Sequence, residues 1–541
     1  MQNGNLRFIT SFLILNVIFV LPGWIAEPGH HLIPPFMHLS SQGIYDGILY
    51  LLFRRESQDI LRLHLECFGA GLLIIVMKKP PKVFLSISLF ILFFYEIYDK
   101  ITIRFKGSRA NFFQDYHDAK PLFVFLWEAQ PILLLTIPPV LWLIFKVIHW
   151  LIKTLIQQRP TSKVRSNYTL FLGLLTIYCF TIFGRYDLAR RDLVLRSTVG
   201  SFTENIEKSI EEQAIANTSL VVPPFPPLEE LQNPPDIFLF VVESYGSVLY
   251  HDSRLRDGFK PYIDRVEAQL SKNGFEAVSR FSEAPVFGGR SWLSLATILS
   301  GRKISNNIQY RSFTDSITQW PHLANVLNGL NYNTIALFPA NRNRLGIKNT
   351  NLYGTDHYLD GDSIPYSGPP IGFGKIPDHH SLDFSQKFFK SPNFMFFMTV
   401  SSHAPWRETP DFSPYNSSLG GKPRSIEDGL YDFWGGFEDI PRGFLKSIQY
   451  EWTMIKQFIL SHKNKNSVFI VVGDHQPHFA RQYGLSTPVH FISSNPKTLH
   501  RLFLEGFAKG LTPSPEGSPT SHEAINSLTL YALAKKHTRA P

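Results

Sequence analysis

Apolar positions are distributed differently in the two ends of the chain. Up to about residue 184 long apolar runs dominate, and five of them approach the length that crosses ~30 Å of hydrocarbon: 7–26, 60–77, 82–98, 129–152 and 167–184. The second run contains Arg62, His64 and Glu66, so an interfacial or re-entrant stretch at 43–53 is an alternative to it. We predict an α-helical membrane domain of about five transmembrane helices over residues 1–184.

The loops between these runs predict an orientation. The second-to-third and the fourth-to-fifth loops carry Lys and Arg without an acidic residue, whereas the other two loops mix both signs. Because Lys and Arg concentrate on the cytoplasmic side of a membrane, we expect a multi-pass protein of the plasma (inner) membrane with a cytoplasmic N-terminus. Five spans then place everything after residue 184 outside the cytoplasm.

The pattern changes after the last long run. Residues 185–235 begin helix-like and end Pro-rich, which favours an extended extracytoplasmic connector. From residue 236 the chain shows short, continuous apolar runs that are typical of buried parallel strands: DIFLFVVE, YNTIALF, NFMFFMTV, SVFIVVGD and PVHFIS. We therefore predict an α/β domain with a mainly parallel sheet over 236–541.

Composition agrees with this division and excludes some functions. A chain of 541 residues exceeds one hydrophobic core, so two structural units are expected. Its two cysteines lie in the apolar first third, which leaves the C-terminal part without a disulfide framework or a catalytic cysteine. Many of the cations behind the net charge of +9 flank apolar runs. We assign them to membrane topology and anionic lipid, and expect no nucleic-acid partner.

Polar residues that bind metals or take part in catalysis follow three of the predicted strands. Glu243 ends the first, His403 follows the third with two serines before it, and Asp474 with His475 ends the fourth. Because sites of open α/β sheets lie at the carboxyl ends of strands, we expect these side chains to converge. Two carboxylates and an imidazole suit Mn²⁺ or Zn²⁺ better than Ca²⁺.

A candidate nucleophile lies between the first two of these strands. In the stretch FGGRSWLSLATILSGRK, two glycines precede Ser291 at the start of an apolar helical pattern. An ordinary N-cap is one interpretation of a serine in this position. The start of a helix is also where anions are bound and a hydroxyl can be activated.

This stretch resembles the alkaline phosphatase and sulfatase superfamily, whose nucleophile begins a helix ten residues before a Gly-Arg pair. Ser291 lies ten residues before the Gly-Arg pair at 301–302. Ser294 matches the inner serine of the sulfatase pattern and is the fallback nucleophile, but Leu293 and Leu295 replace the proline and arginine that direct conversion to formylglycine. The resemblance therefore implies an unmodified serine and argues against a classical sulfatase.

The chain is most similar in plan to the lipoteichoic acid synthases and their phosphoglycerol and phosphoethanolamine transferase relatives. VVESYG resembles their strand-end Glu motif, VVGDHQPH their Gly-Asp-His motif, and SSHAPW the superfamily's His-x-Pro. The stretch LNGLNYNTIALFPANRNRLGIKNTNLYGTDHYLD also resembles theirs. The resemblance implies five spans, a connector and an external α/β/α sandwich of the alkaline phosphatase type. Most relatives use threonine as nucleophile, so Ser291 is a departure.

The resemblance also implies roles for single residues. One divalent ion, Mn²⁺ or Zn²⁺ with Mg²⁺ as a third option, would be held by Glu243, Ser291, Asp474 and His475. The ion would activate Ser291 as nucleophile and polarise a phosphate oxygen. His403 would donate to the phosphoryl oxygens or the leaving group, the alternative being a loop histidine without a catalytic role.

Further substrate contacts each have a structural alternative. Arg344 would bind phosphate, and its alternative is a solvated loop arginine. His478 would be a second metal or substrate contact, and its alternative is a residue that only supports the metal ligands. Trp406 and Trp434 would line the acceptor cleft, and their alternative is buried aromatic packing.

The function implied is a metal-dependent transferase. It would move a phosphoglycerol or phosphoethanolamine head group from a membrane phospholipid to an envelope glycan or lipid through a covalent phosphoserine. A membrane-anchored hydrolase, either a phosphodiesterase or a sulfatase-like enzyme, is the enzymatic alternative. The non-enzymatic alternative is an inactive member that binds a glycan or a partner protein.

Overall fold

The structure is a computed structural model that describes residues 2–26, 63–106, 109–159, 195–216, 234–410 and 439–533, with short gaps inside these ranges. The chain forms two compact units. Unit 1 comprises residues 1–104 and 108–211, and unit 2 comprises 105–107 and 212–541. Each unit is described on its own below.

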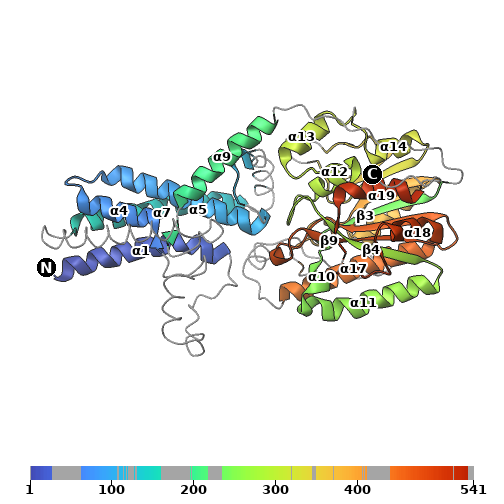
Figure 1. Cartoon of the computed structure of the whole chain (residues 1–541). Helices are drawn as coiled ribbons and strands as arrows, with labels where there is room; N and C mark the ends of the chain where they lie inside the picture. Colours follow the sequence, from blue (N-terminus) through green and yellow to red (C-terminus); the bar gives the residue numbers. More distant parts are fainter. Residues whose placement is uncertain are drawn as a thin grey trace. The chain divides into compact units, whose positions relative to one another are not determined.

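Unit 1 is helical. Its long elements are α1 (Gln2–Ala26), α4 (Leu65–Val76), α5 (Lys82–Lys106), α7 (Pro131–Gln157) and the larger part of α9 (Thr198–Ala216) (Figure 1). A short parallel pair, β1 (Leu63–His64) with β2 (Leu195–Arg196), precedes α4 and α9. The helices pack through one apolar cluster that includes Leu15, Ile74 and Leu151, all without exposed surface.

The prediction of five membrane spans is not confirmed. Among the described residues one helix, Leu134–Gln157, is long and apolar enough to cross a bilayer. Among the described residues of the second predicted run, the helix is α4, whose 12 residues rise ~18 Å and fall short of the hydrocarbon thickness. The first and third predicted runs lie within the 25-residue helices α1 and α5. The fifth run and the stretch 43–53 lie outside the described residues.

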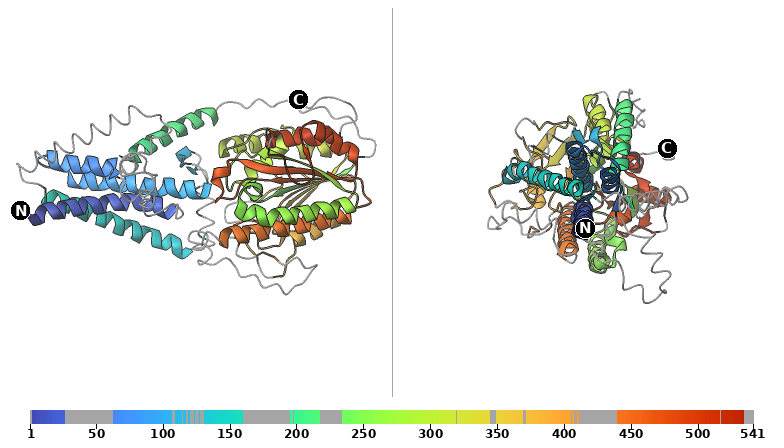
Figure 2. Two further views of the ribbon diagram at one scale, coloured as in Figure 1. Left: turned by 60° about the horizontal axis from the view of Figure 1, so that its bottom comes forward. Right: turned by 90° about the vertical axis from the view of Figure 1, so that its left-hand side faces the viewer.

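Unit 2 is built on a nine-stranded sheet in the order β10-β4-β9-β8-β3-β7-β5-β6, with β11 paired to β4. The central strands β8, β3 and β7 run parallel, and β5 and β6 continue the parallel half. Figure 2 shows this twisted sheet between two layers of helices. The strands are β3 (Asp236–Val242), β4 (Glu276–Glu283), β5 (Asn333–Phe338), β6 (His357–Asp360), β7 (Asn393–Met398), β8 (Ser467–Gly473), β9 (Ser486–Ser493), β10 (Ala508–Lys509) and β11 (Thr520–Ser521).

Four of the five predicted strands are parallel as expected, but the direction of the fifth was predicted wrongly. The run PVHFIS forms β9, which pairs antiparallel with both β8 and β4. A parallel neighbour needs a long crossover, whereas the chain passes from β8 to β9 through a connection whose helical element is the short 3-10 turn Arg481–Tyr483. The sheet is therefore mixed. The four strands β4, β6, β10 and β11 were not predicted, because they lack a continuous apolar run.

Alternate side chains of β3 enter two separate cores. Ile237, Leu239 and Val241 face one core, and Phe238 and Phe240 face the other, as the two-residue period of a strand requires. The first core is covered by α12 (Ser291–Ser300), α13 (Asn307–Asp315), α14 (Leu323–Gly329), α18 (Pro496–Leu504) and α19 (His522–Leu533). The second is covered by α10 (Val248–His251), α11 (Ser253–Lys272), α15 (Asp378–Ser385) and α17 (Asp439–Ser461).

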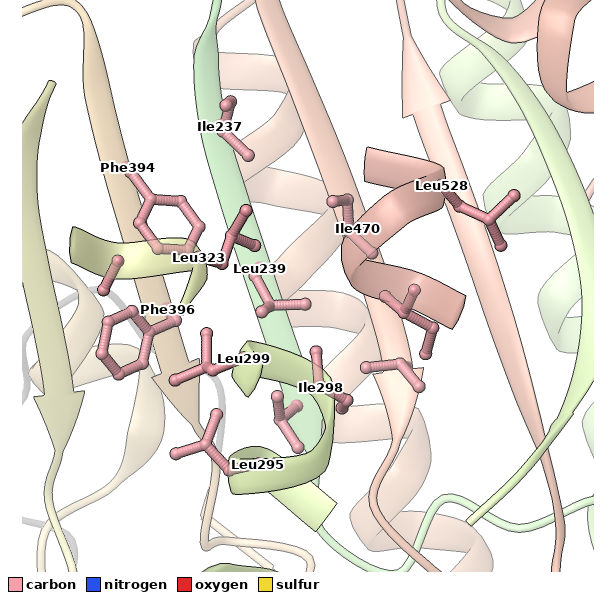
Figure 3. Close-up of a cluster of buried hydrophobic side chains, with 14 of the residues drawn as sticks. Ile237, Leu239, Leu295, Ile298, Leu299, Leu323, Phe394, Phe396, Ile470 and Leu528 are labelled. Atoms are coloured by element: carbon pink, nitrogen blue, oxygen red, sulfur yellow. The ribbon is translucent and has the colours of Figure 1, made fainter. Parts of the chain in front are cut away.

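Helix α12 lies directly on the parallel half of the sheet. Figure 3 shows Leu295, Ile298 and Leu299 against the apolar side chains of β3, β7 and β8. Eight of its ten residues are buried, which suits an all-round apolar helix inside a domain. This packing fixes the start of α12, where Ser291 is located, relative to the strand ends.

Candidate active site

The site begins with three neighbouring strands that end at the same level. The amide of Asp474 donates to the carbonyl of Val242 at 3.1 Å, and the amide of Thr399 donates to Val241 at 3.0 Å. These bonds continue the ladders of β8–β3 and β3–β7 one residue beyond the strands. Glu243, Thr399 and Asp474 are thus held side by side at the carboxyl edge of the sheet.

Two tight turns lead away from this edge. After Glu243 the chain reverses through Ser244, whose φ of 58° lies in the left-handed region. At Gly473 a side chain would collide with the carbonyl of Tyr245, so glycine is required for the two turns to touch. The Glu-Ser-Tyr-Gly and Gly-Asp-His sequences are therefore parts of one packed arrangement, although about 230 residues separate them.

The predicted ligand side chains converge. The structure places one ligand atom each of Glu243, Asp474 and His475 within 4.8 Å of one another, and all three residues are buried. His475 Nε2 lies 3.6 Å from Glu243 Oε1 and 3.3 Å from Asp474 Oδ2. Ser291 completes the group, because its Oγ donates to Glu243 Oε2 at 2.8 Å and lies 3.3 Å from His475 Nε2.

Ser291 is the first residue of α12 and is not its N-cap. The N-cap position belongs to Arg290, which has a left-handed φ of 61° and makes no side-chain capping bond. That backbone bend directs the Ser291 hydroxyl toward Glu243 and His475. Ser294, the fallback nucleophile, is fully buried and donates to the backbone carbonyl of Asp474 at 2.6 Å. Its hydroxyl thus holds the turn after β8 against α12.

Hydrogen bonds around the cluster leave lone pairs pointing inward. His475 Nδ1 lies 2.9 Å from the carbonyl of Gln476, which can only accept, so Nδ1 carries the hydrogen and Nε2 presents its lone pair in the neutral ring. Asp474 Oδ1 accepts from the amides of Ser244 and His475, both at 2.7 Å. Asp474 Oδ2 is buried and accepts no hydrogen bond in the part of the chain that the structure describes.

The two buried carboxyl groups are held in different states. Burial raises the pKa of Asp474 well above its usual range, and the negative charge of Glu243 raises it further. Burial also acts on Glu243, but the nearby His475 and His403 and the hydroxyls of Ser244 and Ser291 outweigh it and lower the pKa of this group. A cation between the two groups would remove the reason for Asp474 to keep a proton.

This donor set fits a divalent metal ion. The imidazole lone pair of His475 faces one oxygen of each carboxyl group, at 3.6 Å for Glu243 and 3.3 Å for Asp474, which is unfavourable unless a cation or a proton separates them. Nitrogen with oxygen ligands is the set that Zn²⁺ and Mn²⁺ accept. Glu243, Asp474 and His475 would hold the ion, with Ser291 Oγ as the fourth ligand.

Other predicted residues lie at different distances from this cluster. His403 is close enough to lower the pKa of Glu243, and its ring stacks on Phe373 with centroids 4.0 Å apart. Trp406 is buried and donates from Nε1 to the carbonyl of Ser402 at 2.6 Å, with His478 stacked on its ring. The structure therefore places Trp406 as a packing residue, and His478 lies beside it and not among the three ligand groups. Two predicted contacts, Arg344 and Trp434, lie outside the described residues.

Sequence patterns missed several hydroxyl groups that support the cluster. Ser244 Oγ donates to Glu243 Oε1 at 2.8 Å, and Ser402 Oγ donates to the Glu243 carbonyl at 2.7 Å. Thr399 Oγ1 accepts from the Glu243 amide at 3.2 Å. These residues follow directly after strands, and that position is a signal in the sequence. Single serine and threonine residues are common in loops, however, so the position alone does not identify supporting residues.

Comparison with known protein families gives a match for the C-terminal part of the chain. Residues 235–501 match the family described as sulfatase. This match agrees with the resemblance to the alkaline phosphatase and sulfatase superfamily that the sequence motifs indicate. A comparison with curated protein sequences found no match.

Similar solved structures include a lipoteichoic acid synthase, a phosphoethanolamine transferase and a phosphoglycerol transferase. The lipoteichoic acid synthase LtaP of Listeria monocytogenes is 14% identical over 61% of this chain and 79% of its own, with a TM-score of 0.35. The integral membrane lipooligosaccharide phosphoethanolamine transferase A of Neisseria meningitidis is 13% identical over 98% and 95%, with a TM-score of 0.47. The Streptococcus pyogenes phosphoglycerol transferase GacH, solved with sn-glycerol-1-phosphate, is 13% identical over 60% and 89%, with a TM-score of 0.33.

Adding Mn²⁺ or Zn²⁺ to the metal-free, detergent-solubilised chain is expected to raise the unfolding temperature of unit 2. An ion at 100 times its dissociation constant stabilises the folded state by about 2.7 kcal/mol. The Asp474→Asn variant is expected to lose this shift, whereas Asp257→Asn, an exposed carboxyl on α11, keeps it. Thermal unfolding followed by near-ultraviolet circular dichroism makes the measurement. An equal metal response in both variants would contradict the ligand assignment.

Without metal, Asp474→Asn is expected to stabilise the protein at neutral pH. The raised pKa of Asp474 means that the folded chain binds its proton more tightly than the unfolded chain does. The resulting stability is complete below the ordinary carboxyl pKa and is lost as the pH rises through the raised value. In EDTA, the unfolding temperature of wild type should therefore fall more steeply than that of Asp474→Asn between mildly acidic and neutral pH. Parallel curves would show that Asp474 is ionised throughout.

Proposed function

We propose that this protein is a metal-dependent transferase that moves a phospho-alcohol head group from a membrane phospholipid to an envelope glycan or lipid. The observation that carries the proposal is the convergence of Ser291 with Glu243, Asp474 and His475 at the carboxyl edge of a sulfatase-family sheet. A hydroxyl nucleophile beside a buried ligand set is the arrangement that attack on a phosphate ester needs.

Ser291 is the group that attacks. Its hydroxyl hydrogen faces Glu243 Oε2 at 2.8 Å, and the lone pair of His475 Nε2 lies 3.3 Å away, so two acceptors are placed for the proton. In the first step the bond from Ser291 Oγ to phosphorus forms and the bond from phosphorus to the diacylglycerol oxygen breaks. The diacylglycerol oxygen leaves with a proton. The product on the enzyme is a phosphodiester of Ser291 that carries the head group.

The second step reverses the first with a different alcohol. A hydroxyl of the acceptor attacks phosphorus, the bond to Ser291 Oγ breaks, and the proton of the acceptor returns to the serine. A bound divalent ion would supply Lewis-acid polarisation of a phosphate oxygen and a lowered pKa of the serine hydroxyl. His403, in the loop after β7 and near Glu243, would donate to the phosphoryl oxygens or to the leaving oxygen.

The sequence around Ser291 favours phosphoryl over sulfuryl chemistry. Leu293 and Leu295 stand where a classical sulfatase has the proline and arginine that direct formylglycine formation, and Ser291 itself already has hydrogen-bond partners as a serine. When the head group passes to the acceptor alcohol, the unmodified hydroxyl of Ser291 is regenerated and can react again. Anchoring beside the membrane favours a lipid donor, because donor and enzyme then share one surface.

We place unit 2 outside the cytoplasm, in accord with the charge pattern of the loops in unit 1. Protease added to intact spheroplasts of an expressing bacterium is expected to digest unit 2 and to leave the cytoplasmic loops protected. Digestion is measured by immunoblotting with an antibody against an epitope located after residue 533. Protection of that epitope until the membrane is permeabilised would place the domain in the cytoplasm and contradict a lipid donor on the outer surface.

Wild type loaded with Mn²⁺ is expected to form a head-group adduct on Ser291 when it is incubated with phosphatidylglycerol or phosphatidylethanolamine. Mass spectrometry of the peptide that contains Ser291 identifies the donor from the added mass. Ser291→Ala should abolish the adduct and lower head-group transfer at least ~1,000-fold, because the covalent route is lost. The matched control is Ser461→Ala, a serine on α17 whose hydroxyl bonds within its own helix.

The fate of labelled head group separates the candidate functions. Transfer to an added alcohol or glycan supports the transferase, and release to water alone in the presence of acceptors supports the hydrolase. Normal metal binding without adduct formation, transfer or release would support the non-enzymatic alternative, a protein that binds a glycan or a partner. A Ser291 peptide with the mass of formylglycine would contradict serine chemistry directly.

A further inference from the structure

A second pair of buried carboxyl groups lies behind the loop that follows β7. Asp378 is the first residue of α15, Glu451 lies within α17, and neither side chain has exposed surface. The two carboxyl groups lie within hydrogen-bonding reach of each other. The proposed mechanism uses neither of them, and buried acids without a role are costly enough to require an explanation.

The hydrogen bonds around the pair determine where its proton lies. Asp378 Oδ2 accepts from the amides of Val400 at 2.7 Å and Ser401 at 2.6 Å. Among the described residues, no well-formed hydrogen bond from an N–H or hydroxyl group reaches Asp378 Oδ1 or either oxygen of Glu451. The Ser402 amide and the Ser401 hydroxyl are the nearest such donors, to Glu451 and to Asp378 respectively, and the Ser402 contact adds a second link between the pair and the loop. Two ionised carboxylates cannot hydrogen-bond to each other, so one proton is shared. Because Asp378 serves as an acceptor for two amides, Glu451 is the protonated member and donates to it.

The charges of the surroundings agree with that assignment. Burial raises the pKa of Glu451 well above its usual range, and the charge of Asp378 and the hydrogen bond to it raise it further. Burial also raises the pKa of Asp378, but the hydrogen bond from Glu451 and the amides of Ser401 and Val400 oppose this effect. Tyr450, His379 and Glu243 are the other titratable groups near the pair.

The loop held by Asp378 in turn holds Glu243. Thr399 Oγ1 accepts from the Glu243 amide at 3.2 Å, and Ser402 Oγ donates to the Glu243 carbonyl at 2.7 Å. Val400 and Ser401, the residues bonded to Asp378, lie between these two contacts. His403 follows directly in the chain. A shift of this loop would therefore move Glu243 and His403 together.

We propose that Asp378 and Glu451 form a shared-proton acid pair that positions the active site, by holding the loop 399–403 against Glu243. The pair acts through the loop and does not touch the substrate, so its members are positioning residues. The inference rests on the proposed function for its effect on turnover. Helix α17 supplies rigidity, since the side chains of Phe444, Ile448 and Trp452 around Glu451 are buried in the second core.

The experiment compares conservative replacements at both positions in the Mn²⁺-loaded full chain. Glutamine at 451 can donate from its amide to Asp378 as the protonated glutamate does, so Glu451→Gln is expected to retain head-group transfer within about threefold of wild type. Glu451→Ala removes the donor and is expected to lose about 10- to 100-fold. Asp378→Asn must turn its oxygen to the loop amides and its NH₂ group to Glu451, which reverses the bond and is expected to cost a similar factor.

The loss should appear in kcat with little change in KM, because the pair places reacting groups and does not contact lipid. Asp383→Asn, an exposed carboxyl on the same helix α15, is the matched control and should behave as wild type. Circular dichroism confirms that each variant is folded. Equal impairment of Glu451→Gln and Glu451→Ala would overturn the shared-proton pair, and full activity of Asp378→Asn would overturn the positioning role.

A spectroscopic measurement keeps the pair testable if no transfer is found. The infrared difference spectrum of wild type minus Glu451→Gln at neutral pH is expected to show the carbonyl stretching band of a protonated carboxylic acid. Absence of this band, with carboxylate bands in its place, would overturn the protonation assignment whatever the activity of the protein. Failure of Ser291 to form an adduct, with the band present, would overturn the proposed function alone.

Discussion

Two carboxylates, Glu243 and Asp474, are buried beside each other at the ends of adjacent parallel strands, and most of the surrounding structure accommodates their charge. Removing such groups from water is costly, and their mutual repulsion adds to the cost. The domain offsets it with amide donors to Asp474 Oδ1 and with hydroxyl donors to Glu243, and leaves Asp474 Oδ2 facing His475 Nε2. A divalent cation is the species that such an arrangement accepts. Burial of these groups therefore costs free energy when no metal ion is bound, and their arrangement suits the binding of one.

Two separate elements hold these carboxylates in addition to the strands that carry them. The start of α12 brings Ser291 to Glu243, and Ser294 of the same helix holds the Asp474 backbone. The loop after β7 binds both backbone polar groups of Glu243. Each element is anchored in a core of its own, α12 in the first and α17, which supports the loop, in the second. Placement of the reacting groups is thus a property of the whole sandwich.

Two of the five described non-glycine residues with a left-handed φ lie at the same edge. Ser244, before the turn to Tyr245, and Arg290, before the nucleophile, both adopt left-handed φ values that cost energy for residues with a side chain. Each bend directs a functional group inward: the Ser244 hydroxyl toward Glu243, and the Ser291 hydroxyl toward the same residue. The tight packing of the two central turns, which requires Gly473, keeps these conformations in place.

By itself, the sequence determined those features that depend on local pattern and chemical type. Continuous apolar runs predicted β3, β5, β7 and β8, because a strand buried on both faces has no polar positions. The strand-end positions of Glu243, Asp474 and His475 indicated a shared metal site, since parallel strands bring their carboxyl ends together. The spacing from Ser291 to the Gly-Arg pair, through its resemblance to the superfamily pattern, indicated Ser291 as the candidate nucleophile. The predicted count of five membrane spans exceeds the one helix that qualifies among the described residues.

Only the tertiary structure decided the features that depend on partners far apart in the chain. The antiparallel direction of β9 and the pairing of β4 follow from neighbours in the sheet, and apolar periodicity contains no information on strand direction. Trp406 became a packing residue because its ring is buried against Phe444 and His478. Asp378 and Glu451 belong to no recognisable sequence motif. Their proposed role in positioning the loop depends on one proton shared between residues that are 73 positions apart in the chain. Contact between residues so far apart in the sequence depends on how α15 packs relative to α17, and no local sequence pattern describes that packing.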